Sequence, residues 1–172
     1  MGVLDGKVAV VAGASRGIGR GAALEAALAG ATVYVTARTI EATETAPVTT
    51  ADEIEAQGGT AVALRCDFTN DDDVARVFAQ VQAEQGRVDL LVNSVFDAAR
   101  FGRTIGQRFW ELPLGIWHEV VDAGTRSAYV ASYHAAPLLL NAGSGLIVNV
   151  SARGAERYRY NVAYGAGKAA LD

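Results

Sequence analysis

Short apolar runs rich in β-branched residues alternate along this chain with longer alanine- and leucine-rich stretches of helical spacing. We expect strands at 7–12, 32–36, 61–65, 89–93 and 145–151, and helices at 17–29, 51–57, 71–85, about 117–140 and from about 161–164 onward. Strands this apolar, each followed by a helix, indicate a parallel sheet that is covered on both faces. With right-handed crossovers this pattern predicts an α/β fold with a doubly wound parallel sheet.

Composition limits the classes of protein to which the chain can belong. With 172 residues, of which 51% are apolar and 20% charged, it has the size of one domain and enough apolar side chains for a core. The net charge of −4 does not favour binding to nucleic acid or to an anionic membrane. No apolar run approaches the roughly 18 residues of a membrane-spanning helix. Cys66 is the one cysteine, which excludes an intrachain disulfide and leads us to expect a reducing, cytoplasmic location.

A glycine-rich segment directly follows the first expected strand and opens the first helix. Glycines allow a tight turn and close approach to a pyrophosphate, whose charge the free N–H groups and dipole of a helix N-terminus attract. The GxxxGxG spacing differs from the GxGxxG fingerprint, but the strand–loop–helix context is the one that fingerprint requires. We therefore expect this segment to bind a dinucleotide through Gly13, Ser15, Arg16, Gly17, Ile18 and Gly19. The alternative is an ordinary turn whose glycines serve helix packing.

The residues that end the second expected strand select the nucleotide. Sites that prefer NAD place an acidic residue there, about 20 residues after the glycines, to bind the ribose 2′-hydroxyl. Here Ala37 fills that position and Arg38 follows it, while Arg16 can reach the same region. Two guanidinium groups and no carboxylate favour a 2′-phosphate, so we expect NADP(H) to be preferred over NAD(H). The alternative is that Arg38 is a solvated turn residue.

Three side chains form a candidate catalytic set. Tyr164 and Lys168 are spaced i, i+4 on one face of the last expected helix, and Ser151 ends the fifth expected strand, at the edge where doubly wound sheets bind ligands. A tyrosine ordinarily titrates near ~10, and a nearby ammonium lowers this pKa toward the range of a usable acid/base. Ser151 can hydrogen-bond a carbonyl or alkoxide oxygen beside Tyr164. Alone, the spacing of Tyr164 and Lys168 is a weak signal, because helices carry such pairs by chance.

Together these segments resemble the short-chain dehydrogenase/reductase family, and they follow the family's order over the whole chain. The segments GASRGIGRG, GATVY and NVAYGAGKAA are also similar to the dehydrogenase/reductase member 1 branch of that family. The resemblance implies an NADP(H)-dependent carbonyl reductase or alcohol dehydrogenase that acts on a small-molecule carbonyl or alcohol. It implies that Tyr164 is the acid/base, that Lys168 activates Tyr164 and binds the ribose, and that Ser151 binds the substrate oxygen. Tyr164 and Lys168 are thereby also expected among the cofactor-binding residues.

The same resemblance assigns further residues and an assembly. It implies that Asp67 and Phe68 lie against the adenine and that Asn93 supports the sheet and the nucleotide. It also implies a homodimer or homotetramer, because members of the family usually associate in this way.

The end of the chain is unusual for a complete domain of this kind. The last expected helix, which carries Tyr164 and Lys168, reaches Asp172 without a glycine, asparagine or proline stop signal. The family's chains are longer. We therefore expect residues 1–172 to be a single NAD(P)-binding domain with the Rossmann fold, truncated inside this helix, with its C-terminal part missing.

The sequence departs from the family's pattern at three places. Ala12 replaces the usual threonine before the glycine segment. The family's NNAG motif is NSVF here, so Phe96 stands where the family has a glycine. Gly124 replaces the asparagine that holds a relay water near Lys168. Asp122 lies two residues away, roughly 200° around an α-helix, and is therefore a poor substitute.

Other side chains have two interpretations. Three aromatic residues line a substrate wall or belong to the core or an interface: Phe109, Trp110 and Trp117. Three basic residues attract an anionic substrate or lie in a solvated loop: Arg153, Arg157 and Arg159. His118 and His134 are single and scattered, without metal-ligand partners, so they are interpreted as surface or capped core histidines and no metal site is expected.

Two functions follow from these features. The first is an NADP(H)-dependent reductase that acts on a lipophilic or cyclic carbonyl compound. The second is a non-catalytic NADP(H)-binding sensor or regulatory protein of the same fold, which the altered NSVF segment and Gly124 favour. The intact Ser151, Tyr164 and Lys168 oppose the second function.

Overall fold

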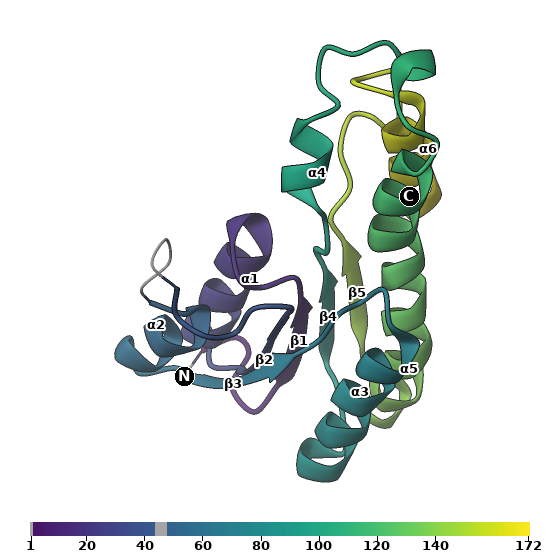
Figure 1. The fold of residues 1–172 in the computed structure, drawn as a ribbon. Helices are drawn as coiled ribbons and strands as arrows, with labels where there is room; N and C mark the ends of the chain where they lie inside the picture. Colours follow the sequence, from purple (N-terminus) through teal and green to yellow (C-terminus); the bar gives the residue numbers. More distant parts are fainter. Residues whose placement is uncertain (1, 44–47) are drawn as a thin grey trace.

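Strands and helices alternate in the computed structural model, which describes residues 2–43 and 48–172 (Figure 1). The elements, in chain order, are β1 (Val8–Ala12), α1 (Gly17–Leu28), β2 (Thr32–Ala37), α2 (Thr50–Ala56), β3 (Thr60–Arg65), α3 (Asp71–Gln85), β4 (Leu90–Asn93), α4 (Ala98–Gly102), the 3₁₀ turn η1 (Phe109–Glu111), the π-helical segment η2 (His118–Arg126), α5 (Ser127–Asn141), β5 (Leu146–Asn149) and α6 (Val162–Leu171). This order confirms the alternation that the apolar pattern predicts.

The strands form one parallel sheet in the order β3-β2-β1-β4-β5. β1 is central, and its residue Val10 lies opposite Tyr34 of β2 and Leu91 of β4. The chain moves outward from β1 to β3 and then crosses back to β4 and β5, so the sheet is doubly wound as predicted. The direction of winding changes between β1 and β4, and doubly wound sheets bind ligands beside the carboxyl ends of the strands at such a point.

Alternate residues of β1 reach opposite faces of the sheet, and two helices cover each face. Val8, Val10 and Ala12 belong to a core cluster that includes side chains of α3 and α5, whereas Ala9 and Val11 belong to a second cluster with α1 and α2. Figure 1 shows these two helix pairs on opposite sides of the sheet. Because both faces of β1 are buried, its uninterrupted apolar sequence is what the position requires.

The expectation of a single helix at about 117–140 is wrong in one respect, because the structure divides this stretch into two helical segments. Its first part, η2, is π-helical, and the regular α-helix α5 begins at Ser127. The Ser127 hydroxyl donates to the carbonyl oxygens of Ala123 and Gly124 at 2.7 and 3.1 Å. Such bonds from a serine to the preceding turn compete with the regular helical ladder and bend helices.

β5 differs from the expectation that every strand is covered on both faces. Its residues Leu146, Ile147 and Val148 are exposed by 58, 39 and 37%. β5 is an edge strand that pairs with β4 and packs against α5, so its side chains are not enclosed on both faces. The strand ends at Asn149, and Ser151 lies two residues beyond it rather than at its last position.

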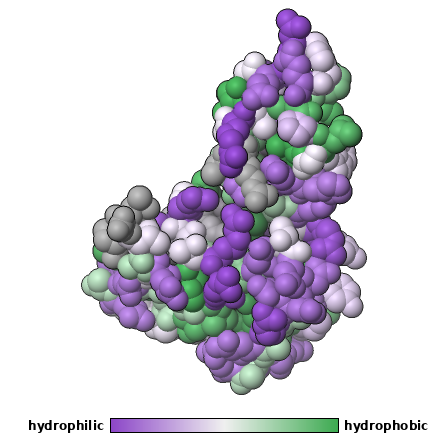
Figure 2. All heavy atoms as spheres, viewed as in Figure 1, coloured by the Kyte–Doolittle hydropathy of each residue, from purple (hydrophilic) through white to green (hydrophobic). Residues whose placement is uncertain are grey.

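Apolar side chains also reach the surface beyond the sheet. Figure 2 shows hydrophobic surface over the upper part of the molecule. In the segment that leads from α4 to η2, Ile105 and Leu114 are exposed by 54 and 94%. Within residues 2–43 and 48–172, no helix combines the length and apolar character needed to cross a membrane.

Candidate active site

A cavity of about 680 Å³ opens at the carboxyl ends of the strands. Its lining comes from segments that follow all five strands and from α6, so residues far apart in the sequence meet there. Cavities of this size accommodate small molecules and cofactors. Most of the expected site residues belong to the lining: Gly13, Ser15, Arg16, Gly17, Ile18, Arg38, Asp67, Phe68, Ser151, Tyr164 and Lys168. The two other expected residues, Gly19 and Asn93, are not part of this lining.

Hydrogen bonds from neighbouring segments hold the glycine segment at the end of β1. The N–H groups of Gly13 and Ala14 donate to the carbonyl oxygen of Thr36 at 2.9 and 3.0 Å. The hydroxyl of Thr50 donates to the carbonyl oxygen of Ala14 at 2.8 Å. Thr36 and Thr50 thus secure the turn in which Ala12 stands in place of the family's threonine. Both are distant from the turn in sequence, and no local motif signals this role.

Gly13 and Gly19 have no room for a side chain. Gly13 has a φ of +79°, and a Cβ added there would lie 2.8 Å from the carbonyl oxygen of Ser94. A Cβ added to Gly19 would lie 2.3 Å from the carbonyl oxygen of Gly13. These glycines therefore let the turn and the first turn of α1 pack closely against each other and against the end of β4.

The N-terminus of α1 fits the pyrophosphate of a dinucleotide. Among the described residues, no side chain caps this end of the helix. By contrast, Thr49, Asn70 and Asn161 cap α2, α3 and α6. The first N–H groups of α1 and the positive end of its dipole are therefore left for an anion. Arg16 and Gly17 at this end line the cavity, which gives an anion access to it.

Asn93 is not part of the cavity lining, but its side chain links three elements of the fold. Its Nδ2 donates to Asn149 Oδ1 at 2.9 Å and to Ser132 Oγ at 3.2 Å, which links β4 to β5 and α5. Its Oδ1 is buried and has no hydrogen-bond partner among the described residues. Asn93 therefore holds the sheet together, and its contact with a nucleotide stays a prediction.

The two expected guanidinium groups both line the cavity. Arg16 is the N-cap residue of α1 and has an extended backbone. Arg38 follows β2, and its Nη2 lies 3.3 Å from Oδ2 of Asp97, which follows β4. Asp97 could not be identified from the sequence, because it is 59 residues away from Arg38 and belongs to no motif.

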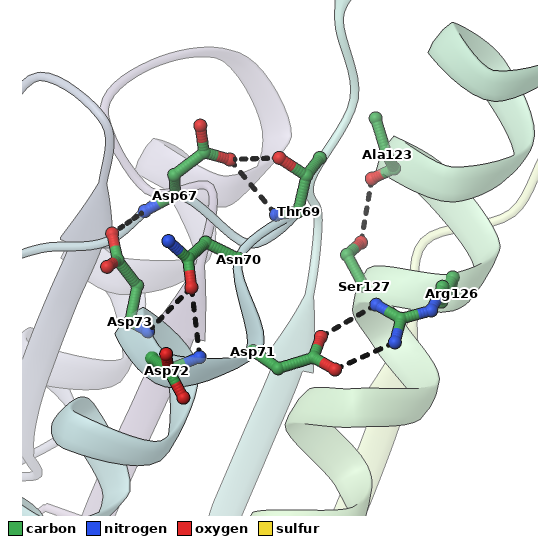
Figure 3. Close-up of polar contacts among 9 residues, drawn as sticks. All are labelled: Asp67, Thr69, Asn70, Asp71, Asp72, Asp73, Ala123, Arg126 and Ser127. Carbon is green, nitrogen blue, oxygen red and sulfur yellow. Dashed lines mark hydrogen bonds and ion pairs between the residues drawn. The ribbon is translucent and has the colours of Figure 1, made fainter.

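Asp67 lies in a network at the N-terminus of α3 (Figure 3). Its Oδ1 accepts hydrogen bonds from the N–H and the hydroxyl of Thr69 at 3.0 and 2.7 Å, and its own N–H donates to Asp73 at 3.0 Å. Arg126, at the end of η2, bridges to Asp71 through two bonds of 2.6 and 2.7 Å. The turn that presents Asp67 to the cavity is therefore tied to α3, and α3 is tied to η2.

Tyr164 is buried in a cluster of four aromatic rings. Its ring centroid lies 4.6, 5.5 and 6.0 Å from those of Phe101, Tyr160 and Phe96, and the residue is 7% exposed. Burial, reinforced by Tyr160, raises the pKa of Tyr164 above its ordinary value, while Arg159 acts in the opposite direction. The expectation that a nearby ammonium lowers this pKa is wrong for the present arrangement, because burial raises the pKa and the positive charge that opposes it is the guanidinium of Arg159.

The side chains of Lys168 and Ser151 both donate hydrogen bonds to backbone carbonyl groups. The Lys168 ammonium donates to Val150 at 2.8 Å and lies 5.3 Å from the ring centre of Phe96. The Ser151 hydroxyl donates to the carbonyl oxygen of Lys168 at 3.4 Å. Burial lowers the pKa of Lys168, and Asp172 partly opposes this effect. The candidate catalytic set thus meets in one cavity, with Phe96 against the lysine.

Asn161 fixes the start of α6, a role that sequence analysis did not assign. It is 1% exposed, its Oδ1 accepts from the N–H of Tyr164 at 2.9 Å, and its Nδ2 donates to Thr104 Oγ1 at 2.9 Å. The preceding residue, Tyr160, has a φ of +68°, an uncommon conformation for a tyrosine. Asparagine before an apolar helix is a preferred N-cap, and this signal could have identified it.

The structure agrees with the interpretation that Asp122 does not replace the family's asparagine. Gly124 is buried within η2, and a Cβ added there would meet nothing within 4 Å. Asp122 instead pairs with His118 at 3.0 Å, and its side chain is 43% exposed. Its carboxylate is therefore directed to the surface of η2.

The aromatic and basic residues with two interpretations are outside the lining of the described cavity. Among the aromatic residues, the exposed fractions are 52% for Phe109, 65% for Trp110 and 48% for Trp117. For these three the core interpretation is wrong, because η1 and the start of η2 lie at the surface. The basic ones are exposed too: Arg153, Arg157 and Arg159.

Comparisons with known proteins agree with this geometry. Residues 7–172 match the family described as short chain dehydrogenase. The chain is 43% identical over 171 residues to Dehydrogenase/reductase SDR family member 1 of Mus musculus, and the match covers 98% of this chain and 53% of that protein. The chain therefore spans about half the length of the curated relatives it matches.

Two solved structures show the same fold with different nucleotides. A metagenomic short-chain oxidoreductase in complex with NADP is 32% identical with a TM-score of 0.84, and the match covers 98% of this chain and 72% of that one. A 7α-hydroxysteroid dehydrogenase complexed with NADH and 7-oxo glycochenodeoxycholic acid is 30% identical with a TM-score of 0.83, and the match covers 98% of this chain and 62% of that one.

Proposed function

This chain belongs to the short-chain dehydrogenase family, and from that premise we propose that the protein is an NADP(H)-dependent oxidoreductase acting on a carbonyl or alcohol group. One observation carries the proposal. The cavity beside the uncapped N-terminus of α1 is also lined by Tyr164, Lys168 and Ser151. A dinucleotide and a proton donor would therefore meet in one space.

The proposed cofactor is NADP(H) in preference to NAD(H). Ala37 ends β2 without a carboxylate, and Arg38 and Arg16 contribute two guanidinium groups to the lining. Guanidinium groups bind phosphate oxygens through paired N–H donors. The two solved relatives hold NADP in one case and NADH in the other, so the preference rests on the residues of this chain. Asp67 and Phe68 would lie against the adenine.

The protein's part in the proposed reaction is to supply a proton and to hold the reactants. The nicotinamide would supply the hydride when bound. Tyr164 would donate its hydroxyl proton to the carbonyl oxygen of the substrate, which becomes the alcohol oxygen. Its raised pKa keeps that proton in place beforehand, and the Lys168 ammonium would stabilise the phenolate that is left. Ser151 would orient the substrate oxygen.

We also propose that the substrate is a lipophilic or cyclic carbonyl compound. The rings of Phe96, Phe101 and Tyr160 surround Tyr164, so the group that donates the proton has apolar neighbours. The reacting oxygen would have hydrogen-bond partners in Tyr164 and Ser151, whereas other polar groups of a substrate would lose their hydration against these rings. A reducing cytoplasm is the compartment we propose, because Cys66 is the one cysteine.

Replacing Tyr164 by phenylalanine tests the proposed function against the alternative of a non-catalytic NADP(H) sensor. We expect Tyr164→Phe to lose NADPH-dependent reduction of aromatic and cyclic ketones while its Kd for NADPH stays unchanged. Tyr129→Phe is the matched control, because Tyr129 is exposed by 70% on α5. Turnover that persists in Tyr164→Phe would contradict the assignment of the acid. Saturable NADPH binding without any turnover in the unmodified protein would favour the sensor.

Fluorescence titration with NADPH and with NADH tests the proposed cofactor. We expect NADPH to bind more tightly, and we expect this difference to disappear in Arg38→Ala. Equal or tighter binding of NADH by the unmodified protein would contradict the preference.

A further inference from the structure

Arg38, the residue proposed to bind the 2′-phosphate, forms an ion pair with Asp97. Arg38 follows β2 and Asp97 follows β4, and these strands flank β1 on either side. The Arg38 Nη2 and the Asp97 Oδ2 are 3.3 Å apart, and both residues line the cavity. The pair therefore spans the carboxyl end of β1, where the glycine segment begins.

The two partners differ in how firmly the structure holds them. The side chain of Asp97 is 12% exposed, and its carbonyl oxygen accepts a hydrogen bond from the N–H of Phe101 at 3.0 Å, next to α4. The side chain of Arg38 is 53% exposed, and an exposed arginine retains many rotamers. Asp97 is therefore the fixed partner, and Arg38 is the partner that can move.

A carboxylate and a phosphate compete for the same guanidinium group. Asp97 contacts the Nη2 end of this guanidinium, and a second anion bound to the same group is repelled by the first. A 2′-phosphate that binds Arg38 must either displace the Asp97 carboxylate from the guanidinium group or bind close to that carboxylate and be repelled by it. Each possibility reduces the affinity for a nucleotide that carries this phosphate, and neither affects a nucleotide that lacks it.

We propose that Asp97 is a specificity-determining residue for the nucleotide. It holds Arg38 in the nucleotide-free protein and gives it up to the 2′-phosphate, so it weakens the binding of NADP(H) and leaves that of NAD(H) unchanged. The inference rests on the proposed function, since it takes Arg38 as the ligand of the 2′-phosphate.

Calorimetric titration of the purified chain with 2′,5′-ADP and with ADP tests the inference. Exposed ion pairs are weak, so we expect Asp97→Asn to lower the Kd for 2′,5′-ADP by roughly three- to fivefold and to leave the Kd for ADP unchanged. Glu41→Gln is the control, because it removes another carboxylate from the lining of the same cavity. We expect it to change neither Kd to the same extent.

The double variant Arg38→Ala/Asp97→Asn tests whether Asp97 affects nucleotide binding through Arg38. We expect it to bind 2′,5′-ADP as weakly as Arg38→Ala, because Asp97 acts through Arg38. An unchanged Kd in Asp97→Asn, or a gain that survives without Arg38, overturns the inference while the NADP(H) preference stands. An equal Kd of the unmodified protein for both nucleotides removes the preference itself, and the inference with it.

Discussion

The ammonium of Lys168 lies 2.8 Å from the carbonyl oxygen of Val150, the residue before Ser151. In return, the hydroxyl of Ser151 donates to the carbonyl oxygen of Lys168 at 3.4 Å. These two hydrogen bonds together fasten α6 to the chain that leaves β5. The structure places the ammonium beside Ser151 by this link, within a cavity that Tyr164 also lines.

The first prediction concerns this ammonium. Lys168→Met removes the charge and keeps an unbranched chain, and we expect kcat/KM for NADPH-dependent ketone reduction to fall by roughly 10²-fold or more, the usual scale of acid–base catalysis. We expect the melting temperature to change little, because the loss of the hydrogen bond to Val150 is offset by removing the cost of burying a charge. Lys168→Arg should be impaired as well, because a branched guanidinium does not replace a compact ammonium. Wild-type kcat/KM in Lys168→Met would refute the role.

Two glycines of α1 provide a matched pair of substitutions. Gly19→Ala should abolish NADPH binding, because the new Cβ would lie 2.3 Å from the carbonyl oxygen of Gly13 and the loop must shift. Gly21→Ala makes the same change where a Cβ meets nothing within 4 Å. It should keep its Kd and gain up to ~1 kcal/mol in free energy of unfolding. Nucleotide titration and urea unfolding measure both quantities, and equal Kd values would show that the close approach is unnecessary.

Asp89 should make the stability of the protein sensitive to acid. It is buried just before β4 and accepts bonds of 2.5–3.1 Å from Lys7, Arg87 and the N–H of Val8. Burial alone would raise its pKa, but these bonds together hold the pKa below its ordinary value. A lowered pKa in the folded state contributes stability that is complete above the unfolded value of ~3.9 and is lost as the pH falls through the folded value. The free energy of unfolding should therefore decline below about pH 4.

Asp89→Asn tests this assignment. At neutral pH it should lower the free energy of unfolding by about 2 kcal/mol, because buried donors lose a charged acceptor. The substitution should also reduce the decline of the free energy of unfolding at acidic pH. Glu55→Gln, on the exposed side of α2, controls for the loss of one negative charge. Urea unfolding at several pH values gives the comparison, and identical pH profiles for Asp89→Asn and the unmodified protein would contradict it.

Asn161 should couple the stability of α6 to catalysis. Asn161→Ala loses both the cap on the N–H of Tyr164 and the bond to Thr104, and we expect a loss of about 2 kcal/mol together with a lower kcat. Thr104→Val removes the second bond, and the bond that the Thr104 hydroxyl donates to the carbonyl oxygen of Phe101 at 2.8 Å, but keeps the cap. It should therefore have a smaller effect on kcat. A fall in stability with an unchanged kcat would mean that the cap supports the helix without positioning Tyr164.

Cys66 should report the opening of the core. It is fully buried, and burial raises the pKa of its thiol to about 12, so almost no reactive thiolate is present near neutral pH. We expect Ellman's reagent to leave the native protein unlabelled and to label one thiol per chain in urea, because Cys66 is the one cysteine. Rapid labelling without denaturant would contradict the burial.

The predictions that the structure confirms depend on local patterns. Apolar runs, helical spacing and stop signals identify elements one at a time, and the doubly wound order follows because parallel strands need helical crossovers. The position of the glycine segment is confirmed in the same way, since it lies between β1 and α1, whereas its binding of a dinucleotide stays a prediction.

Partners that are distant in sequence could not be predicted in this way. Thr36 and Thr50 hold the turn after β1, and Asp97 reaches Arg38, only because the order of the strands brings their segments to one edge. Phe96 packs near Tyr164 for the same reason, and the resulting burial reverses the expected direction of the tyrosine's pKa shift.

The sequence by itself therefore determined the elements, their order and the residues available for chemistry. Hydrophobic periodicity, capping and glycine geometry act over a few residues and can be recognised in one dimension. The tertiary structure alone decided which of those residues touch, how deeply each is buried and in which direction its pKa moves. Contacts, solvation and electrostatic interactions depend on distance in space, and the packing of the sheet and its helices sets that distance.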